Sequence, residues 1–90
     1  MNILITGVAG LLGSRLATWI LENTQYQVVG VDDLSGGYID HVDTRVEFYK
    51  LDLMKDFEEI ESLFKNYKFD IIYHLAAYAA EGLSPFIRKF

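Results

Sequence analysis

Four short apolar runs alternate along this chain with segments of helical periodicity. Continuous apolar runs of this length are typical of strands that are buried on both faces of a sheet. They cover residues 2–6, 26–32, 45–52 and 69–77. Between them, apolar residues recur at helical spacing over residues 11–22 and again from Phe57 to Tyr67. Because strand-helix-strand units of this spacing pair in parallel through right-handed crossovers, the pattern predicts an α/β fold.

Local signals refine the expected boundaries. Residues 33–44 have turn composition throughout, which predicts an irregular connection between the second and third strands. Asp56 and Glu59 have the spacing of a capping box at the start of the second helix. Ser84 followed by Pro85 is typical of a helix start, so we expect a third helix to begin there.

Three glycines follow the first predicted strand at intervals of three residues, in the stretch ITGVAGLLGS. In a dinucleotide-binding loop, Gly7 allows a tight bend, Gly10 lets a pyrophosphate approach the main chain, and Gly13 lets helix and strand pack closely. The unpaired amides of the helix then face the phosphates. A tight turn without a ligand is the alternative interpretation. The strand before, the helix after, and Asp32 at the end of the next strand favour the dinucleotide site.

Two aspartates and one histidine are the other candidates for chemistry. Asp32 can accept hydrogen bonds from both hydroxyls of an adenosine ribose, and its alternative role is an Asx turn, for which Asp33 is the better candidate. Asp52 is either a turn or cap residue or a contact to the edge of the adenine. His74 has no carboxylate or second histidine near it in the sequence, which favours a hydrogen-bonded core histidine. Trp19, Tyr49, Tyr67 and Tyr73 are expected to be packing residues.

Composition limits the kinds of partner that the chain can have. Ninety residues form one small domain, without cysteine and therefore without disulfides or thiolate metal sites. A formal net charge of -5, with the basic residues scattered singly, argues against a nucleic-acid surface. No apolar run has the length of a membrane span. We therefore expect a cytoplasmic protein that holds phosphates with backbone groups, with no nucleic acid or membrane as a partner.

Four segments together resemble one known family. They are TGVAGLLGS, VDDLSGG, the aspartate of KLDL, and HLAAYAA. In this order and spacing they are similar to the amino-terminal segment of the extended short-chain dehydrogenase/reductases, above all the NAD-dependent epimerase/dehydratase group that acts on nucleotide sugars. The resemblance implies a partial Rossmann fold with sheet order 3-2-1-4. It also implies a single NAD-binding domain over residues 1–90 that is incomplete at its carboxyl end.

The same resemblance assigns roles to individual residues, with NAD as the cofactor. The pyrophosphate would be wrapped by Gly7, Gly10, Leu11, Leu12 and Gly13. The adenosine ribose would be held by Asp32 and bordered by Asp33, Leu34, Ser35 and Gly36, and the adenine would contact Asp52 and Leu53. The ribose and phosphate side of the cofactor would be lined by Leu75, Ala76, Ala77 and Tyr78.

The chain departs from the family pattern at the catalytic pair. The family uses a Tyr-x-x-x-Lys pair, in which the tyrosine moves a proton while a hydride passes to the nicotinamide. No tyrosine here has a lysine four positions later. The residues at those positions are Gly30, Val42, Leu53, Ile71, Ala77 and Gly82.

Two hypotheses for function follow. The first is the NAD-binding part of a nucleotide-sugar epimerase or dehydratase, without catalytic residues and inactive by itself, whose sugar-nucleotide substrate would bind only in a full-length parent. The second is a non-catalytic module that senses NAD or binds a partner chain. In either case we expect an uncovered apolar face on the fourth strand, and self-association through it.

Overall fold

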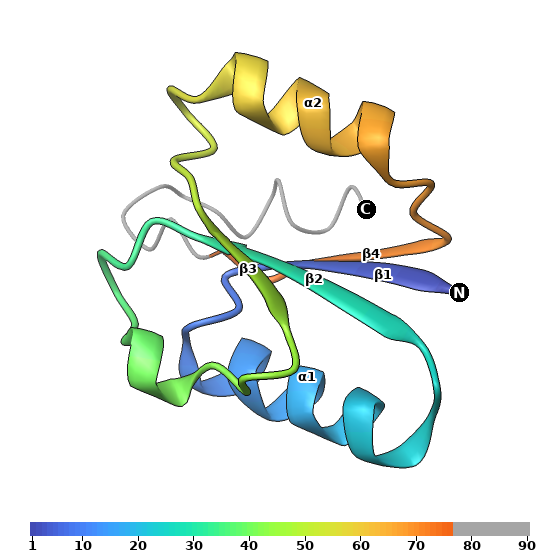
Figure 1. The fold of residues 1–90 in the computed structure, drawn as a ribbon. Helices are drawn as coiled ribbons and strands as arrows, with labels where there is room; N and C mark the ends of the chain where they lie inside the picture. Colours follow the sequence, from blue (N-terminus) through green and yellow to red (C-terminus); the bar gives the residue numbers. More distant parts are fainter. Residues whose placement is uncertain (77–90) are drawn as a thin grey trace, which may run out of the picture.

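The computed structural model describes residues 1–76, and these form one four-stranded parallel sheet with a helix on each face (Figure 1). In chain order the elements are β1 Asn2–Thr6, α1 Leu11–Asn23, β2 Gln27–Asp32, the 3-10 helix η1 Ile39–His41, β3 Glu47–Lys50, α2 Phe57–Asn66 and β4 Ile71–His74. The strand order is β3-β2-β1-β4, so the predicted Rossmann topology is confirmed. The helix expected from Ser84 lies outside the described residues. Within residues 1–76, no helix is long and apolar enough to cross a membrane.

The register of the sheet brings the ends of three strands together. Thr6 at the end of β1 lies opposite Val31 of β2 on one side and His74 of β4 on the other. Asp32, the last residue of β2, pairs with Lys50 of β3. The loops that follow β1, β2 and β4 therefore leave the sheet at the same edge, where ligands bind in open parallel sheets.

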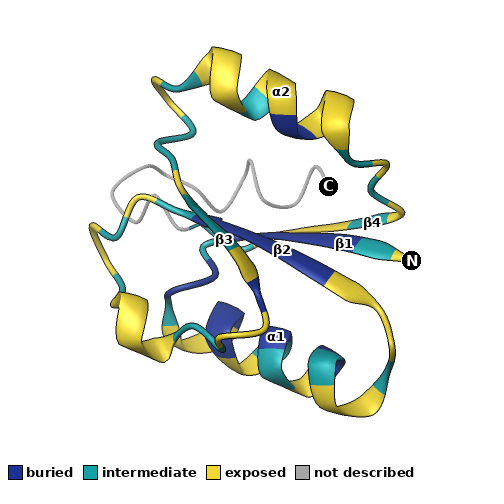
Figure 2. Cartoon of the chain, in the orientation of Figure 1, coloured by how far each residue is buried: buried dark blue, intermediate teal, exposed yellow. Residues whose placement is uncertain are grey.

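Both faces of the central strands β1 and β2 are covered, which explains their continuous apolar runs, whereas the residues of β3 and β4 are half-buried or exposed (Figure 2). On one face, side chains of β1 and β2 pack with α1 and the glycine loop; the buried members of this cluster are Ile3, Ile5, Val8, Ala17, Ile20, Val28 and Val46. On the other face, Leu4, Val29 and Val31 pack with Leu63 of α2.

Helix α1 presents small residues to the sheet, and this corrects one expectation. Its buried residues include Gly13, Ser14 and Ala17, whereas Trp19 is 60 % exposed. The helix lies so close to the loop after β1 that only small side chains fit between them. Trp19 lies outside this buried face, which also includes Ile20, so the prediction that it packs inside is wrong.

Strands β3 and β4 are shorter than predicted, and a hydrogen bond replaces the expected cap of α2. Strand β3 begins at Glu47 because Arg45 N and Val46 N donate to the side chain and carbonyl of Asp43, which closes a turn before the strand. Strand β4 covers Ile71–His74 within the predicted 69–77. Asp56 is the N-cap residue of α2, but its carboxylate accepts a hydrogen bond from Asp52 N at 2.7 Å and makes no cap bond. The predicted capping box is therefore wrong.

Candidate functional site

A cavity of about 190 Å³ opens at the edge of the sheet where β1, β2 and β4 end. Its walls come from four segments: the glycine loop after β1, the loop after β2, the segment after β3 and the end of β4. The lining residues are Gly7, Gly10, Val31, Asp32, Asp33, Ser35, Gly36, Leu51, Leu53, Leu75 and Ala76. Most of these were predicted as cofactor contacts, and the fold brings them to one place. Ala77 and Tyr78 lie outside the described residues.

Two of the three loop glycines are required by the fold itself. Gly7 has a φ of +76°, and a Cβ there would lie 2.7 Å from Ala76 N at the end of β4. A Cβ on Gly13 would collide with the carbonyl oxygen of Gly7, so this residue lets α1 pack against the loop. Neither glycine needs a ligand to explain it.

Gly10 is different, because nothing in the described chain demands a glycine there. Its φ is -77°, which any residue can adopt, and the nearest atom to a Cβ would be Gly7 O at an ordinary 3.4 Å. Gly10 also lines the cavity. The space beside it is thus available for a group that approaches the main chain closely.

The start of α1 lacks the side chains that usually satisfy a helix N-terminus. Gly10 is the N-cap and offers no side-chain cap, and the first turn contains no acidic residue. By contrast, the first turn of α2 carries Glu58 and Glu59. The first amide within α1 that bonds back along the chain is that of Ser14, which donates to Gly10 O at 2.9 Å. The preceding amides of Leu11, Leu12 and Gly13 have no acceptor inside the helix, so this positive end suits an anion.

Asp32 connects two of the loops that line the cavity, the glycine loop and the loop after β2. Its Oδ2 accepts a hydrogen bond from Ala9 N in the glycine loop, and its Oδ1 accepts one from Leu34 N, both at 2.8 Å. An ionised carboxylate has about four acceptor positions, so two remain for ribose hydroxyls. Asp32 therefore makes the Asx-type contact considered from the sequence and still faces the cavity.

The loop after β2 is built from local side-chain contacts. Asp33 Oδ1 accepts hydrogen bonds from Ser35 N at 2.9 Å and Ser35 Oγ at 2.7 Å, and these bonds lower the pKa of the Asp33 carboxyl. The Asx turn expected for Asp33 is thus present. Leu34 lies between them with a φ of +66°, a left-handed conformation that is uncommon for leucine.

The segment after β3 supplies leucines to the cavity, while Asp52 makes a turn. Asp52 Oδ1 accepts a hydrogen bond from Met54 N at 2.8 Å, which is the turn-forming role left open by the sequence. Leu51 and Leu53 on either side of it line the cavity. Leu51 and Val31 were missed because an apolar residue at a strand end has the same pattern as a core residue.

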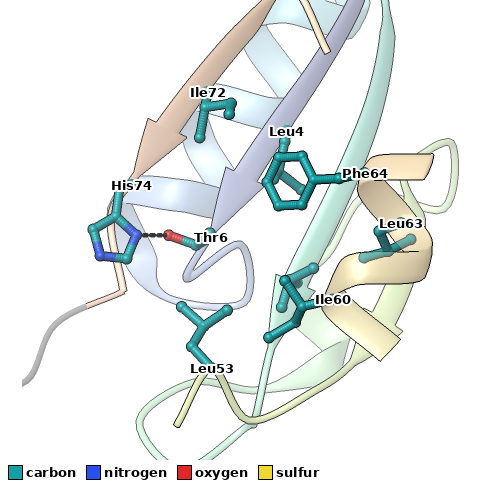
Figure 3. A pocket seen from close by; sticks show the side chains of 9 residues that line it. Leu4, Thr6, Leu53, Ile60, Leu63, Phe64, Ile72 and His74 are labelled. Atoms are coloured by element: carbon teal, nitrogen blue, oxygen red, sulfur yellow. Dashed lines mark hydrogen bonds between the residues drawn. The ribbon is translucent and has the colours of Figure 1, made fainter. Parts of the chain in front are cut away.

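His74 lies on a second, larger hollow between the sheet and α2 (Figure 3). This apolar groove measures about 560 Å³, with side chains of α2 on one side and of β4 on the other. His74 Nδ1 lies 2.7 Å from Thr6 Oγ1, and Thr6 Oγ1 accepts a further bond from Ala76 N at 3.3 Å. His74 is hydrogen-bonded as expected, but it is exposed, so its assignment to the core is wrong.

Comparison with known proteins identifies the family. The profile of the NAD dependent epimerase/dehydratase family matches residues 3–85. The chain belongs to this family. The predicted membership is therefore confirmed, and the predicted cofactor, NAD, is the one on which the epimerase/dehydratase family depends.

Curated relatives include both enzyme types named by the family. The chain is 37% identical over 83 residues to dTDP-glucose 4,6-dehydratase of Haemophilus influenzae, covering 86% of this chain and 24% of the relative. It is 35% identical over 82 residues to UDP-glucose 4-epimerase of Mycolicibacterium smegmatis, covering 86% of this chain and 25% of the relative. The chain thus spans about a quarter of the length of the relatives that it matches.

Solved structures agree in fold. The UDP-glucose 4-epimerase of Thermotoga maritima, solved with UDP-glucose, has a TM-score of 0.81 at 38% identity, over 88% of this chain and 25% of that one. The UDP-glucose 4-epimerase of Thermus thermophilus, solved with NAD, has a TM-score of 0.79 at 31% identity, over 93% of this chain and 26% of that one.

Proposed function

We propose that this chain binds NAD and forms the adenosine and pyrophosphate half of the cofactor site of a nucleotide-sugar epimerase or dehydratase. The observation that carries this proposal is Gly10, a glycine that the fold does not need, placed beside a cavity at the bare N-terminus of α1. Membership of an NAD-dependent family and the NAD bound in the Thermus thermophilus relative support it.

Each wall of the cavity suits one part of the cofactor. The pyrophosphate would lie over Gly10 and take hydrogen bonds from the amides of Leu11 and Leu12, since Ala9 N and Gly10 N already donate to Asp32 and Gly7. The ribose hydroxyls would donate to Asp32. The adenine would rest against Leu51 and Leu53, which offer an apolar surface.

The reaction of the parent enzyme would depend on what the bound NAD supplies, which is a hydride acceptor next to the sugar. This chain's own residues would bind and orient the adenosine end. No Tyr-x-x-x-Lys pair occurs in the 90 residues, so we propose that the chain by itself does not catalyse the reaction. We also propose the cytoplasm as its location.

Strand β4 is the surface through which we propose that the chain self-associates. Among the described strands it pairs only with β1, and Ile72 is 50 % exposed. A free edge next to exposed apolar side chains favours pairing with another chain. We expect sedimentation velocity to show an apparent mass that rises with concentration, and Ile72→Lys to reduce this rise. A monomer at every concentration would contradict the proposal.

Titration with parts of the cofactor tests the proposed function. If the site holds the adenosine and pyrophosphate half, ADP-ribose should bind with a Kd within about tenfold of that for NAD, because both carry the groups that the cavity contacts. Nicotinamide mononucleotide lacks the adenosine and should give no measurable heat. Binding of nicotinamide mononucleotide as tight as that of NAD, or no binding of NAD, would refute the assignment.

A further inference from the structure

The loop after β2 touches the glycine loop at a second place, beyond Asp32. Tyr38 N donates a hydrogen bond to Ala9 O at 3.2 Å. Gly37, just before it, lies so close that a Cβ there would collide with Ala9 O and would be 2.6 Å from Ala9 C and 2.9 Å from Gly10 N. These atoms are backbone, which cannot turn aside as the end of a side chain can.

These contacts pair both polar groups of the peptide between Ala9 and Gly10, and the amide of Ala9 just before it is paired as well. The N–H of Ala9 donates to Asp32 Oδ2, the carbonyl of Ala9 accepts from Tyr38 N, and the N–H of Gly10 donates to Gly7 O at 3.1 Å. The backbone groups around this peptide bond are therefore paired with protein atoms. This peptide immediately precedes the first amides of α1, which have no acceptor inside the helix, so the bonds that hold it also fix how the chain enters that end of the helix.

From this arrangement we infer that Gly37 is a positioning residue for the NAD site, an inference that rests on the proposed function. We name residues 33–38 the latch loop. Gly37 lets the latch loop close on the glycine loop, and Tyr38 N holds the glycine loop in the conformation that receives the pyrophosphate. Gly37 does not line the cavity, so it acts through Ala9 and Gly10.

The reason for glycine at position 37 is spatial. Among the described glycines only Gly7 has a positive φ, so backbone conformation does not demand glycine at 37. Its neighbour Gly36 has no atom within 4 Å of where a Cβ would lie. A side chain at position 37 would therefore push the two loops apart, and both loops line the cavity, one through Asp33 and Ser35 and the other through Gly7 and Gly10.

The Gly37→Ala variant tests this role when ADP and adenosine are compared. We expect Gly37→Ala to raise the Kd for NAD and for ADP by at least about tenfold, because the amides that would bind the phosphates are no longer held in place. The Kd for adenosine, which has no phosphate, should rise by less, so the ratio of the Kd for adenosine to the Kd for ADP should fall. Ile39→Ala, a half-exposed position in η1 next to the latch loop, is the matched control and should leave all three affinities unchanged. An unchanged ADP-to-adenosine ratio in folded Gly37→Ala would overturn the inference, since a merely structural glycine would lower stability alone.

Hydrogen exchange in the unsubstituted chain provides a second test that needs no variant. The latch predicts that the Tyr38 amide is protected before any ligand is added, because it is bonded to Ala9 O. Exchange of this amide at the rate of an unstructured peptide would overturn the inference. If the chain binds neither NAD nor ADP, the proposed function fails, and the Tyr38 amide still decides whether the latch exists.

Discussion

The glycines of the loop after β1 meet three separate physical needs. Gly7 takes a left-handed conformation, Gly13 allows α1 to pack against the backbone of the loop, and Gly10 leaves space beside the cavity. The first two needs belong to folding and the third to a ligand. Substitutions at these positions should therefore have different consequences, although the residues look alike in the sequence.

Stability should fall when Gly13 is replaced by alanine. In the exposed interior of a helix, replacing glycine by alanine would stabilise the folded protein by up to about 1 kcal/mol. Here the new Cβ collides with Gly7 O, and overpacking of this kind costs about 1–3 kcal/mol. We expect Gly13→Ala to lower the Tm by roughly 5 °C or more, or to prevent folding. Gly36→Ala, where a Cβ meets open space, is the control for stability and should change the Tm little. A Tm for Gly13→Ala at or above the original value would contradict the packing described.

Asp32 should make the site prefer NAD over NADP. The 2′-phosphate of NADP would bring negative charge near this carboxylate, and two unit charges about 4 Å apart repel by about 4 kcal/mol at an effective dielectric constant of about 20. A third of that energy already corresponds to about tenfold in affinity. No arginine lies in residues 33–44 to receive the phosphate.

The charge of Asp32 can be separated from its structural bonds. Asp32→Asn removes the charge and keeps an oxygen that can accept from Ala9 N or Leu34 N, whereas Asp32→Ala also frees both loops. We expect Asp32→Asn to reduce the ratio of the Kd for NADP to the Kd for NAD by about tenfold. Asp32→Ala should also raise the Kd for both NAD and NADP. If Asp32→Asn leaves the ratio of the two Kd values unchanged, Asp32 does not contact the ribose.

At the scale of elements, the turn before β3 is fixed by one charged cluster. Asp43 accepts hydrogen bonds from Arg45 Nε, Nη2 and N and from Thr18 Oγ1 of α1, while Arg45 Nη2 also lies 3.8 Å from Glu22 Oε2. The side chain of Asp43 is only 13 % exposed. This cluster attaches the strand entry to α1, so it sets where β3 starts.

The turn predicts a pH dependence of stability. Hydrogen bonds from the side chain and backbone of Arg45 hold the pKa of Asp43 well below its usual value of 3.8. A carboxyl with a lowered pKa in the folded state stabilises the protein above its unfolded pKa, and this stabilisation is lost as the pH falls through the folded pKa. Below pH 4 the free energy of unfolding should therefore fall more steeply in the original chain than in Asp43→Asn. The free energy of unfolding can be measured by urea denaturation at each pH. The same dependence on pH in the original chain and in Asp43→Asn would contradict the role of this turn.

The sequence could predict the elements because their signals are local, but not how the elements face one another. Apolar runs and helical periodicity indicated the strands and the first helix, and the family resemblance implied the sheet order that the structure has. The exposure of Trp19 reflects which side of α1 faces the sheet. Gly13, Ala17 and Ile20 are buried on that side, and apolar periodicity alone did not separate it from the side that carries Trp19. In the same way, the bond from Asp52 N to Asp56 replaces a capping box that fits the spacing equally well.

At the scale of the whole molecule, the cavity exists because four segments distant in sequence meet at one edge of the sheet. Most of the predicted contacts that the structure describes line it, since residues at the carboxyl ends of parallel strands must lie near one another. Gly37 and Tyr38 escaped prediction because their importance lies in contacts with Ala9, 28 or more positions earlier in the chain. A second glycine directly after Gly36 was the one sequence signal that pointed to them.

Calorimetric titration of the chain and its Gly10→Val variant with NAD tests the central claim most directly. A Cβ at position 10 would meet no atom of the described residues closer than 3.4 Å, so we expect the variant to fold, and circular dichroism can verify this. The branched side chain would occupy the space that the pyrophosphate needs, so the original chain should bind NAD and the folded variant should bind at least a hundredfold more weakly, about 2.7 kcal/mol. Equal affinities in the two folded proteins, or no binding by the original chain, would contradict the claim that this cavity is a dinucleotide site.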